Sequence, residues 1–481
     1  MSLTSKIPAE HATGIVSATP AISLNALIAT AKSAMQGFAS LGQERLDEAV
    51  TALAWSIYEP NRARALAELA CETTNLGDVA SKITKNQRKT FGTLRDLMRV
   101  KSTGIIETLP ERGLVKYAKP VGVVAAITPS TNPSATPVNK AMMSLKGGNA
   151  VIIAPSPLSW TATNATVEAM RDELHKIGLP PDLVQILPKP INRDRTTELM
   201  RLADLVVCTG SLNNVKAAYS SGTPAIGVGA GNVPVIIDES ADLADAATKI
   251  TASKIFDNAS SCSSENAVII VDNIYDDAIA ALQRAGGYMT SADERQRVLD
   301  RLWQDGKLNR DLIARSAQML ADAFDLSAAA REATYFMVEE TGIGEGYPLS
   351  DEKLSLVLTV YRAQDFSDAK DIAVRILEFK GKGHSVGIHT KDMDRARELA
   401  EDMQVVRVLV NQAHTFGNGG GFDNGMPFTL SMGCGTWQGN SISENLNYTC
   451  FLNITHLVTT IPEDKPSEDD LFGAYWAKYG K

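Results

Sequence analysis

The chain has 481 residues, of which 44% are hydrophobic and 21% are charged, a balance typical of globular proteins and, at this length, of more than one lobe. Its formal net charge of −9 and the lack of a block of Lys and Arg argue against nucleic acid or an acidic membrane as a partner. No apolar run approaches the roughly 20 residues of a membrane helix, and the widely spread cysteines, with no metal-ligand spacing, predict a cytoplasmic protein with reduced thiols and no metal site.

The first half of the chain predicts helices followed by an α/β unit. Residues 1–14 lack the pattern of a secretion signal. Apolar residues at helical spacing predict an all-helical region from 22 to about 101. We expect a hairpin at about 104–121 around a Pro-Glu-Arg-Gly turn, and then a buried strand that ends at Thr128. From 149 to 221 strands alternate with helices, which is the pattern of a doubly wound, mainly parallel sheet.

A second α/β series begins after the strand predicted at 234–238. It contains a helix at 242–257, a strand at 267–272, long helices up to about residue 333, and further strands that lead to a closing segment at 450–461. No long linker separates the two series. We therefore expect two lobes with a cleft between them, and clefts are where ligand sites form.

Cys262 stands among small and amide side chains in the stretch KIFDNASSCSSENAVII at 254–270. An unpaired cysteine is ordinarily a buried apolar filler, and we assign that role to Cys71, Cys208 and Cys450. The polar and sterically open surroundings of Cys262 instead suit a thiol that is presented to a substrate. On the residues alone, both interpretations of Cys262 stay open.

Two turns that contain glycine are candidates for holding a cofactor. Gly210 and Ser211 join a predicted strand to a helix, whose N-terminal N–H groups can bind a pyrophosphate. Ser211 is equally an ordinary helix N-cap. The run GVGAGN at 227–232, which includes Gly229, lacks the third glycine of the usual dinucleotide fingerprint, and it is equally a loop that needs positive φ.

Several segments together resemble the CoA-acylating branch of the aldehyde dehydrogenase superfamily. They occur in the family's order between about residues 110 and 445, which makes them far more specific than any single motif. These segments are ITPSTNP (127–133), AAYSSGTPAIGVGAGNVPVIID (217–238), KIFDNASSCSSE (254–265), EKLSLVLTVYRA (352–363), GHS (383–385) and GCGTWQGNSISEN (433–445). The resemblance implies an aldehyde dehydrogenase-like α/β fold with two doubly wound lobes and an oligomerisation hairpin.

The same resemblance implies a division into domains. Residues 1–235 would form the cofactor-binding domain, with the oligomerisation hairpin at about 104–121, and residues 236–432 the catalytic domain. Residues 433–481 would return to the cofactor domain and supply an oligomerisation strand. Because the hairpin and a strand at about 453–461 match segments by which the family makes dimers, we expect a homodimer or homotetramer.

In this family a cysteine attacks the aldehyde, and the matching position is Cys262. Thiolate attack gives an alkoxide, whose collapse expels hydride to the cofactor and leaves an acyl-cysteine thioester. Asn132 matches the asparagine whose amide, with the backbone N–H of Cys262, holds the alkoxide oxygen; one such donor typically contributes about 3 kcal/mol. Asn132 is also explained as a turn-forming residue before proline.

The fate of the thioester depends on position 228. Hydrolytic members of the family carry a glutamate 34 residues before the nucleophile, where it activates water as a general base. This chain has Val228 there, and a valine cannot accept a proton, so the resemblance implies coenzyme A as the acyl acceptor. His384 matches the branch's Gly-His-Ser/Thr motif and could take the proton from the CoA thiol, although histidines near strand starts are more often structural.

The resemblance also implies a nicotinamide cofactor. The residues that match its binding positions are Thr128, Pro129, Ser130, Pro155, Ser156, Pro157, Gly210, Ser211, Gly229 and Glu352. Glu352 matches the glutamate that binds the nicotinamide ribose, although a capping or surface role would also explain it. After the strand at 149–153 the chain lacks the lysine and glutamate that contact the adenosine ribose in hydrolytic members. Without that carboxylate nothing repels a 2′-phosphate, so NADP is favoured slightly over NAD.

The aldehyde is less well defined by the sequence. His414 and Thr415 lie where the family lines its substrate pocket. The closing stretch, NLNYTCFLNITHLV with FGAYWAKYG, is most similar to acylating sulfoacetaldehyde dehydrogenases, which implies sulfoacetaldehyde and the product sulfoacetyl-CoA. Acetaldehyde and succinic semialdehyde remain alternative substrates. A hydrolytic aldehyde dehydrogenase with another base, and a catalytically silent structural member of the fold, remain alternative functions.

Overall fold

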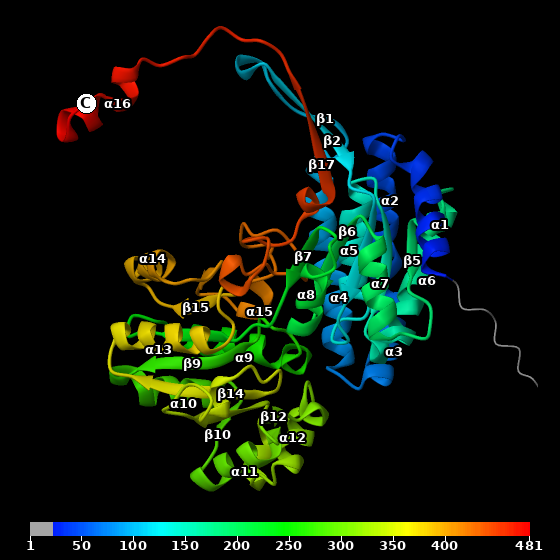
Figure 1. The fold of residues 1–481 in the computed structure, drawn as a ribbon. Coiled ribbons are helices and arrows are strands. Elements are labelled where there is room, and N and C mark those ends of the chain that lie inside the picture. Colours follow the sequence, from blue (N-terminus) through cyan, green and yellow to red (C-terminus); the bar gives the residue numbers. More distant parts are fainter. Residues whose placement is uncertain (1–22) are drawn as a thin grey trace, which may run out of the picture.

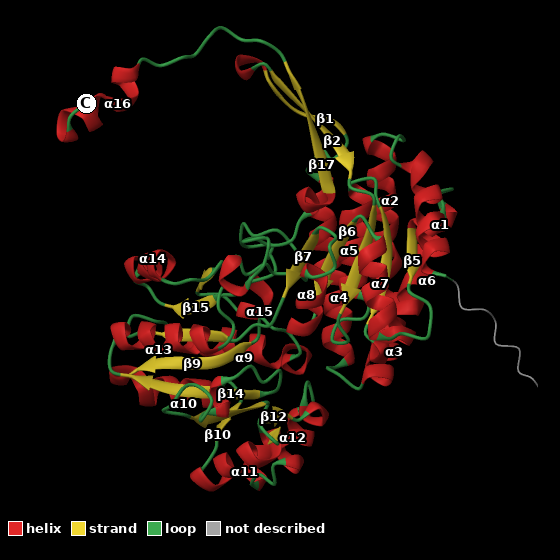
Figure 2. Cartoon of the chain, viewed as in Figure 1, coloured by secondary structure: helices red, strands yellow, loops and turns green. Residues whose placement is uncertain are grey.

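The computed structural model describes residues 23–481 and has the expected α/β architecture (Figure 1). Residues 1–22, on which the prediction about a secretion signal falls, lie outside the described residues. Two α/β units form the body of the molecule, and a three-stranded sheet extends away from them (Figure 2). We call the unit around the five-stranded sheet the first unit, and the unit around the seven-stranded sheet the second unit.

The first unit begins with four helices, as the helical spacing of apolar residues predicts. They are α1 Leu24–Phe38, α2 Gln43–Tyr58, α3 Pro60–Thr74 and α4 Val79–Met98. Apolar residues of α1 and α2 join a core cluster that also contains the strands of the five-stranded sheet. Helix α4 differs from them because it buries charged groups, the side chains of Lys82 and Lys85. A buried lysine is costly in free energy unless it is paired, so we expect these two lysines to have an acidic partner.

The five-stranded sheet is parallel throughout and has the order β5-β4-β3-β6-β7. Its strands are β3 Val123–Thr128, β4 Ala150–Pro155, β5 Val184–Ile186, β6 Leu205–Thr209 and β7 Ala225–Val228. The helices that connect them are α5 Ala135–Lys146, α6 Trp160–Lys176, α7 Arg193–Leu202 and α8 Leu212–Tyr219. The order of the strands reverses between β3 and β6, and open α/β sheets bind ligands in the crevice at the carboxyl ends of such neighbours.

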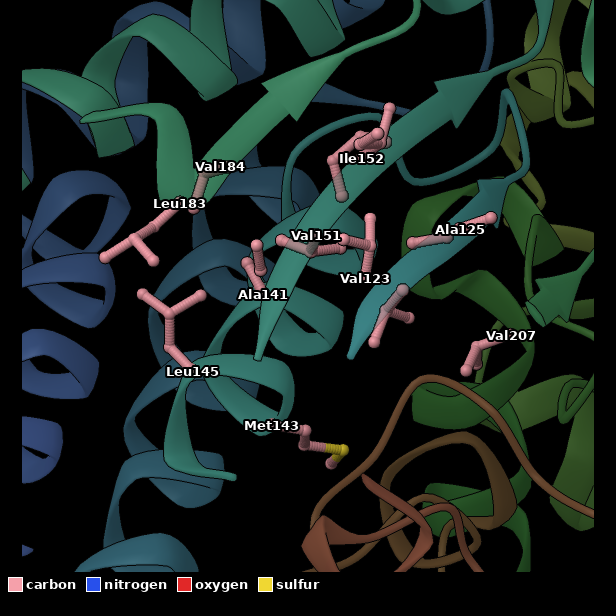
Figure 3. Packing of buried hydrophobic residues seen from close by; sticks show 14 of the residues in the cluster. Val123, Ala125, Ala141, Met143, Leu145, Val151, Ile152, Leu183, Val184 and Val207 are labelled. Carbon is pink, nitrogen blue, oxygen red and sulfur yellow. The ribbon is translucent and has the colours of Figure 1, made fainter. Parts of the chain in front are cut away.

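Branched apolar side chains fill the space between this sheet and α5. Figure 3 shows Val123 and Val151, from neighbouring strands, in one cluster with Ala141 and Leu145 of α5. All four side chains are fully buried. Because helices cover the sheet, its central strands are apolar on both faces, which explains the uninterrupted apolar runs in the sequence.

The seven-stranded sheet of the second unit is also parallel, with the order β10-β13-β14-β9-β8-β15-β16. Its strands are β8 Val233–Ile237, β9 Glu265–Val271, β10 Gly287–Met289, β13 Tyr335–Glu339, β14 Val357–Ala363, β15 Val386–His389 and β16 Val408–Val410. The helices are α9 Leu243–Ile255, α10 Tyr275–Arg284, α11 Ala292–Leu302, α12 Ala317–Ala323, α13 Phe366–Phe379, α14 Met393–Asp402 and α15 His414–Gly417. Val235 and Ile237 enter one core cluster and Ile236 enters another, so both faces of this sheet are buried.

The sequence-based elements are wrong in one stretch and incomplete elsewhere. The region predicted as long helices up to residue 333 contains the short helices α10 to α12, strand β10 and the two-residue strands β11 Trp303–Gln304 and β12 Lys307–Leu308. Helices α5 and α13 and strands β7 and β13 were not predicted. Every residue of α5 is buried, so it lacks the amphipathic pattern that marks a surface helix. Short apolar runs such as β13 cannot be assigned from periodicity alone.

The protruding sheet contains the predicted hairpin, β1 Gly104–Leu109 with β2 Leu114–Pro120, and strand β17 Leu452–Val458, all antiparallel. Helix α16 Glu468–Tyr479 lies farther out (Figure 1). Within residues 23–481 no helix is both long and apolar enough to cross a membrane, and the same range contains no group of three candidate metal ligands. The predicted domain division stays a prediction.

Candidate active site

A cavity of about 600 Å³ opens between the two units. Its wall is formed by the segments that follow β3, β6 and β7 in the first unit, by the loop before β9, and by segments near residues 352, 380, 415 and 430. Eight of the predicted site residues line it, namely Pro129, Asn132, Gly210, Ser211, Gly229, Cys262, Glu352 and Thr415. The predicted residues that do not line it are Thr128, Ser130, Pro155, Ser156, Pro157, His384 and His414.

The loop that carries Cys262 has an unusual backbone. Asp257, Asn258 and Ala259 have φ values of 52°, 52° and 58°, which is the left-handed region that side chains other than glycine rarely adopt. Such a run persists only when its surroundings hold it in place. The carboxylate of Asp257 does so, since it accepts hydrogen bonds from Ser260 Oγ at 2.7 Å and from the backbone N–H of Asp78 at 3.0 Å.

Two lysines of α4 hold Asp257 from the other side. Lys82 Nζ lies 3.1 Å and Lys85 Nζ 2.5 Å from Asp257 Oδ2, and all three side chains are buried. Burial opposes the ionisation of Asp257, but the charges of Lys85 and Lys82 outweigh it and lower the pKa of this carboxyl group. The loop before Cys262 is therefore anchored on a buried cluster of one acid and two bases.

This cluster also orients Asn132. Lys85 Nζ donates a hydrogen bond of 2.7 Å to Asn132 Oδ1. This bond orients the amide so that its nitrogen faces away from Lys85. That nitrogen makes only a long 3.4 Å hydrogen bond to Thr131 Oγ1. Asn132 and Cys262 line the same cavity, and within the described chain the backbone N–H of Cys262 has no protein acceptor. Both donors therefore have hydrogen-bonding capacity left for a ligand in this cavity.

The Cys262 thiol is protonated at neutral pH in the free protein. Burial raises its pKa to about 12, and the neighbouring carboxyl of Glu352 adds to the shift. Glu352 lines the cavity and accepts a hydrogen bond of 3.1 Å from the N–H of Gly231. A side chain at Gly231 would collide with the carbonyl oxygen of Cys262, so close packing of these two backbone segments sets the position of the thiol.

His384 lies behind the cavity wall in a buried chain of hydrogen bonds. Its Nδ1 is 2.7 Å from Ser385 Oγ, and the same hydroxyl is 2.8 Å from Nε2 of His414. Arg407 donates a hydrogen bond of 2.9 Å to the carbonyl oxygen of His384. Burial, with the charge of Arg407, keeps the pKa of His384 well below its usual range. Burial also lowers the pKa of His414 to about 3, so both imidazoles are neutral in the free protein.

The carboxyl ends of β3, β6 and β7 have the features of a cofactor site. Pro129, Gly210, Ser211 and Gly229 line the cavity there, with Gly210 and Ser211 leading into α8. Thr128 Oγ1 is buried without a partner among the described residues. A Cβ on Gly229 would lie 2.9 Å from Gln438 Oε1. An orphaned hydroxyl, helix N–H groups and a closely packed glycine fit a phosphate-bearing cofactor.

Val228 is the last residue of β7 and is buried. Among the described residues that line the cavity, Glu352 is the only carboxylic acid. Its pKa is raised to about 7, chiefly by burial. The position that activates water in hydrolytic enzymes therefore has no carboxylate, whereas Glu352 lies beside Gly231.

Sequence reasoning missed the residues that position the site. These are Lys82, Lys85, Gly231, Ser385 and Arg407. Sequence reasoning also missed Lys89, which lines the cavity. The lysines of α4 left a signal, because positions 82, 85 and 89 lie on one face of a helix. Their partner Asp257 is far away in the sequence, so only the fold shows that this basic face is buried.

Comparisons with known proteins agree with this geometry. The family model described as "Aldehyde dehydrogenase family" matches residues 4–300. A sulfoacetaldehyde dehydrogenase (acylating) of Cupriavidus necator is 50% identical to the chain over 457 residues, covering 95% of this chain and 93% of the relative.

Two solved structures are similar over nearly the whole chain. An acetylating aldehyde dehydrogenase from Geobacillus thermoglucosidasius is 33% identical, with a TM-score of 0.89, and the match covers 92% of this chain and 98% of that one. A propionaldehyde dehydrogenase from Rhodopseudomonas palustris, solved with bound propionyl-CoA, is 25% identical with a TM-score of 0.81, covering 91% and 94% of the two chains.

Proposed function

The chain belongs to the aldehyde dehydrogenase family, and we propose that it oxidises sulfoacetaldehyde to sulfoacetyl-CoA. The reaction is aldehyde + CoA + NAD(P)⁺ ⇌ acyl-CoA + NAD(P)H + H⁺. One observation carries the acylating assignment: Cys262 and Asn132 share a cavity, while Val228 stands where a hydrolytic enzyme has its water-activating glutamate. The 50% identical relative from Cupriavidus necator supports the choice of aldehyde.

In the first half-reaction Cys262 attacks the aldehyde, and two N–H donors stabilise the oxyanion that forms. The thiol of Cys262 loses its proton, which is the H⁺ released in the overall reaction. The sulfur then bonds to the aldehyde carbon, and the electron pair of the C=O π bond moves to the oxygen as negative charge. Asn132 Nδ2 and the N–H of Cys262 are free to hold that oxygen, since Lys85 occupies the other end of the amide. Donors that are fixed in advance stabilise the charge without reorganisation.

A nicotinamide cofactor would be held by Thr128, Pro129, Gly210, Ser211, Gly229 and Glu352. When bound, it supplies the hydride acceptor of the oxidation. We propose NADP over NAD because the end of β4 and the two residues after it, 154–157, contain no carboxylate, whereas hydrolytic relatives present a glutamate to the ribose there. Ser130, Ser156 and Pro157 stay in the proposal as residues of the adenosine side, which lies outside the cavity wall.

The second half-reaction transfers the acyl group from Cys262 to CoA. The CoA sulfur attacks the thioester, and the leaving group is the Cys262 thiolate. We propose His384 as the acceptor of the CoA proton, because its imidazole is neutral and its Nε2 has no partner among the described residues. Ser385 and His414 would orient it through their hydrogen bonds, while Thr415 contacts the substrate from the cavity wall.

A hydrolytic reaction is the second candidate, because one carboxylic acid does line the cavity. Glu352 has a pKa raised to about 7, which would suit a general base. Product analysis with and without CoA separates the two reactions. We expect sulfoacetyl-CoA with CoA present and at most one equivalent of reduced cofactor per site without it. Sulfoacetate formed equally fast in the absence of CoA would overturn the acylating assignment.

The protruding sheet supports a proposal about assembly. Ile105, Ile454, Leu457 and Val458 expose between 40% and 66% of their surface on this sheet. Exposed apolar residues on an extended sheet mark a protein interface, so we propose a homodimer or homotetramer built through this sheet. The cytoplasm, where thiols stay reduced, is the proposed location.

A further inference from the structure

Helix α4 carries two cations that form no ion pair with a carboxylate of the described chain. Its basic face continues from the buried Lys82 and Lys85, which share Asp257, to the half-buried Arg88 and Lys89. Within residues 23–481 no carboxylate forms an ion pair with Arg88 or Lys89. A charge that is partly withdrawn from water and has no counterion is unfavourable, so this end of the helix has the electrostatics of a binding site for an anion.

Lys89 lies in the wall of the cavity that contains Cys262. Its ammonium group donates one hydrogen bond of 2.8 Å, to the carbonyl oxygen of Gly419, although an ammonium group has three donors. Burial lowers the pKa of Lys89 to about 7, and the charges of Arg88 and Lys85 add to the shift. A bound anion would oppose each of these effects.

Arg88 reaches the same region through a side pocket of about 30 Å³. This side pocket and the main cavity share Lys89, Asn132, Ser261, Thr415 and Leu430 in their walls. The guanidinium group lies between three phenylalanine rings, at 5.4 Å from Phe416, 5.6 Å from Phe422 and 5.4 Å from Phe428. Its Nη1 is buried and has no hydrogen-bond partner among the described residues. The rings hold the cation but leave its donors unused.

We propose that Lys89 and Arg88 bind the sulfonate group of the aldehyde substrate and so select a short anionic aldehyde. This inference rests on the proposed function, and it deepens it by naming the groups that recognise the substrate. Sulfoacetaldehyde carries its sulfur two bonds from the carbonyl carbon. An aldehyde held at Cys262 and Asn132 therefore needs cations in the same cavity, and Lys89 is a cation of that wall.

The donors where the side pocket meets the main cavity match the hydrogen-bonding capacity of a sulfonate group. Three sulfonate oxygens can accept from an ammonium group, from the guanidinium fork and from a hydroxyl. Lys89 and Arg88 supply the first two, and Thr415 and Ser261 present hydroxyl groups in the walls of both pockets. A methyl group, as in acetaldehyde, uses none of these donors.

The test compares charged and uncharged aldehydes. We would measure kcat/KM with sulfoacetaldehyde and with propionaldehyde for the wild type, Lys89→Met and Arg88→Met at saturating CoA and cofactor. Losing a buried charge contact should lower kcat/KM for sulfoacetaldehyde by roughly 30-fold or more. The value for propionaldehyde should change less than threefold, and Lys89→Arg should recover part of the loss. An equal fall for both aldehydes would overturn the inference and leave the proposed function intact.

Arg95→Met is the matched control. Arg95 stands on the same helix over two of the same rings, Phe422 and Phe428, but it pairs with Asp96 at 2.7 Å and does not line the cavity. Its replacement should leave the ratio of the two kcat/KM values unchanged. A change in KM for CoA or for the cofactor, with no change in aldehyde selectivity, would instead assign Lys89 and Arg88 to a phosphate of those ligands and overturn the proposal.

A second measurement does not depend on turnover. Ethanesulfonate lacks the aldehyde, so it should protect Cys262 from iodoacetamide in the wild type and fail to do so in Lys89→Met. Protection that is equal in both proteins, or absent from both, would overturn the inference. If the wild type acylates propionaldehyde but not sulfoacetaldehyde, the proposed substrate is wrong, whereas loss of all CoA-dependent product would remove the proposed function itself.

Discussion

The two ends of the basic face of α4 differ in one respect. Lys82 and Lys85 meet the carboxylate of Asp257 and hold the loop of Cys262 and the amide of Asn132. Arg88 and Lys89, one turn farther along, meet aromatic rings and a carbonyl oxygen but no carboxylate. The difference teaches that a position on this basic face does not define the role of a cation. A paired cation belongs to the scaffold, whereas an unpaired cation beside a cavity is available to a ligand.

Removing the carboxylate of Asp257, which Lys82 and Lys85 share, should give the largest change in stability. Asp257→Asn leaves Lys82 and Lys85 buried without a counterion, and breaking a buried pair in this way typically costs about 3–5 kcal/mol of unfolding free energy. Urea denaturation measures this loss. Asp423→Asn is the control, because Asp423 is exposed and acts on Arg88 through its charge without forming an ion pair. That change should stay within about 0.5 kcal/mol.

The pH dependence of stability gives the same test in another form. The pKa of Asp257 is lower in the folded protein than its ordinary value. Its stabilising contribution is therefore present above the pKa of the unfolded chain and is lost as the pH falls through the folded pKa. Asp257→Asn should flatten this acid limb of the stability curve. An unchanged acid limb would show that the two lysines are not held by this carboxylate.

Replacing Asn132 should affect catalysis and spare stability. Asn132→Ala removes one oxyanion donor, and a loss of this kind typically lowers kcat by about 10² to 10³-fold. Because Lys85 keeps its bond to Asp257, the melting temperature should change little. The pre-steady-state burst of reduced cofactor reports the affected step. A burst of unchanged rate would exclude Asn132 from the oxyanion site.

His384 lies outside both ends of the basic face, so its removal should leave aldehyde selectivity untouched. In His384→Ala we expect the burst of reduced cofactor to keep its rate, while steady-state transfer to CoA slows by about 10²-fold, the usual effect of losing a general base. Rapid-quench kinetics separate the two steps. Slowing of both steps to the same extent would mean that the histidine is structural, as the burial of its ring also allows.

The smallest expected effect is a pH dependence of selectivity. Lys89 is charged below its pKa of about 7 and loses the charge as the pH rises through that value. The ratio of kcat/KM for sulfoacetaldehyde to that for propionaldehyde should fall by roughly tenfold between about pH 6.5 and 8.5. Other titratable or charged groups are near: Cys262, Glu352 and Lys380 line the cavity, and Lys85 and Arg88 adjoin Lys89. Their titration would change the reaction with both aldehydes alike, so it cancels in the ratio. A constant ratio would contradict the assignment of Lys89.

Part of the fold and part of the site can be predicted from the sequence. Local patterns suffice to predict the strand that ends at Thr128, the hairpin and the motif around Cys262, because each depends only on residues that are adjacent in the sequence. The resemblance of separated motifs added Asn132 and Glu352, which line the same cavity as Cys262. Short buried elements such as β10 and β13 were lost, since their apolar residues show no distinctive period.

The pairing of the α4 cations could not be predicted from sequence. Asp257 is 175 residues from Lys82 and 172 from Lys85, so no spacing rule joins them. Which cations lack a partner is visible only once the fold is known. The burial of His384 and His414 behind the cavity wall is a further case, because a histidine in a motif gives no sign of the direction of its ring.

The most direct test of the central claim is the mass of the intact protein after reaction without CoA. Wild-type enzyme mixed with sulfoacetaldehyde and the oxidised cofactor should gain one sulfoacetyl group per chain, located on Cys262 by peptide mapping. The adduct should persist until CoA is added and then leave as sulfoacetyl-CoA. Unmodified protein with steady accumulation of sulfoacetate would contradict the account, because it would mean that water, rather than CoA, takes the acyl group from Cys262.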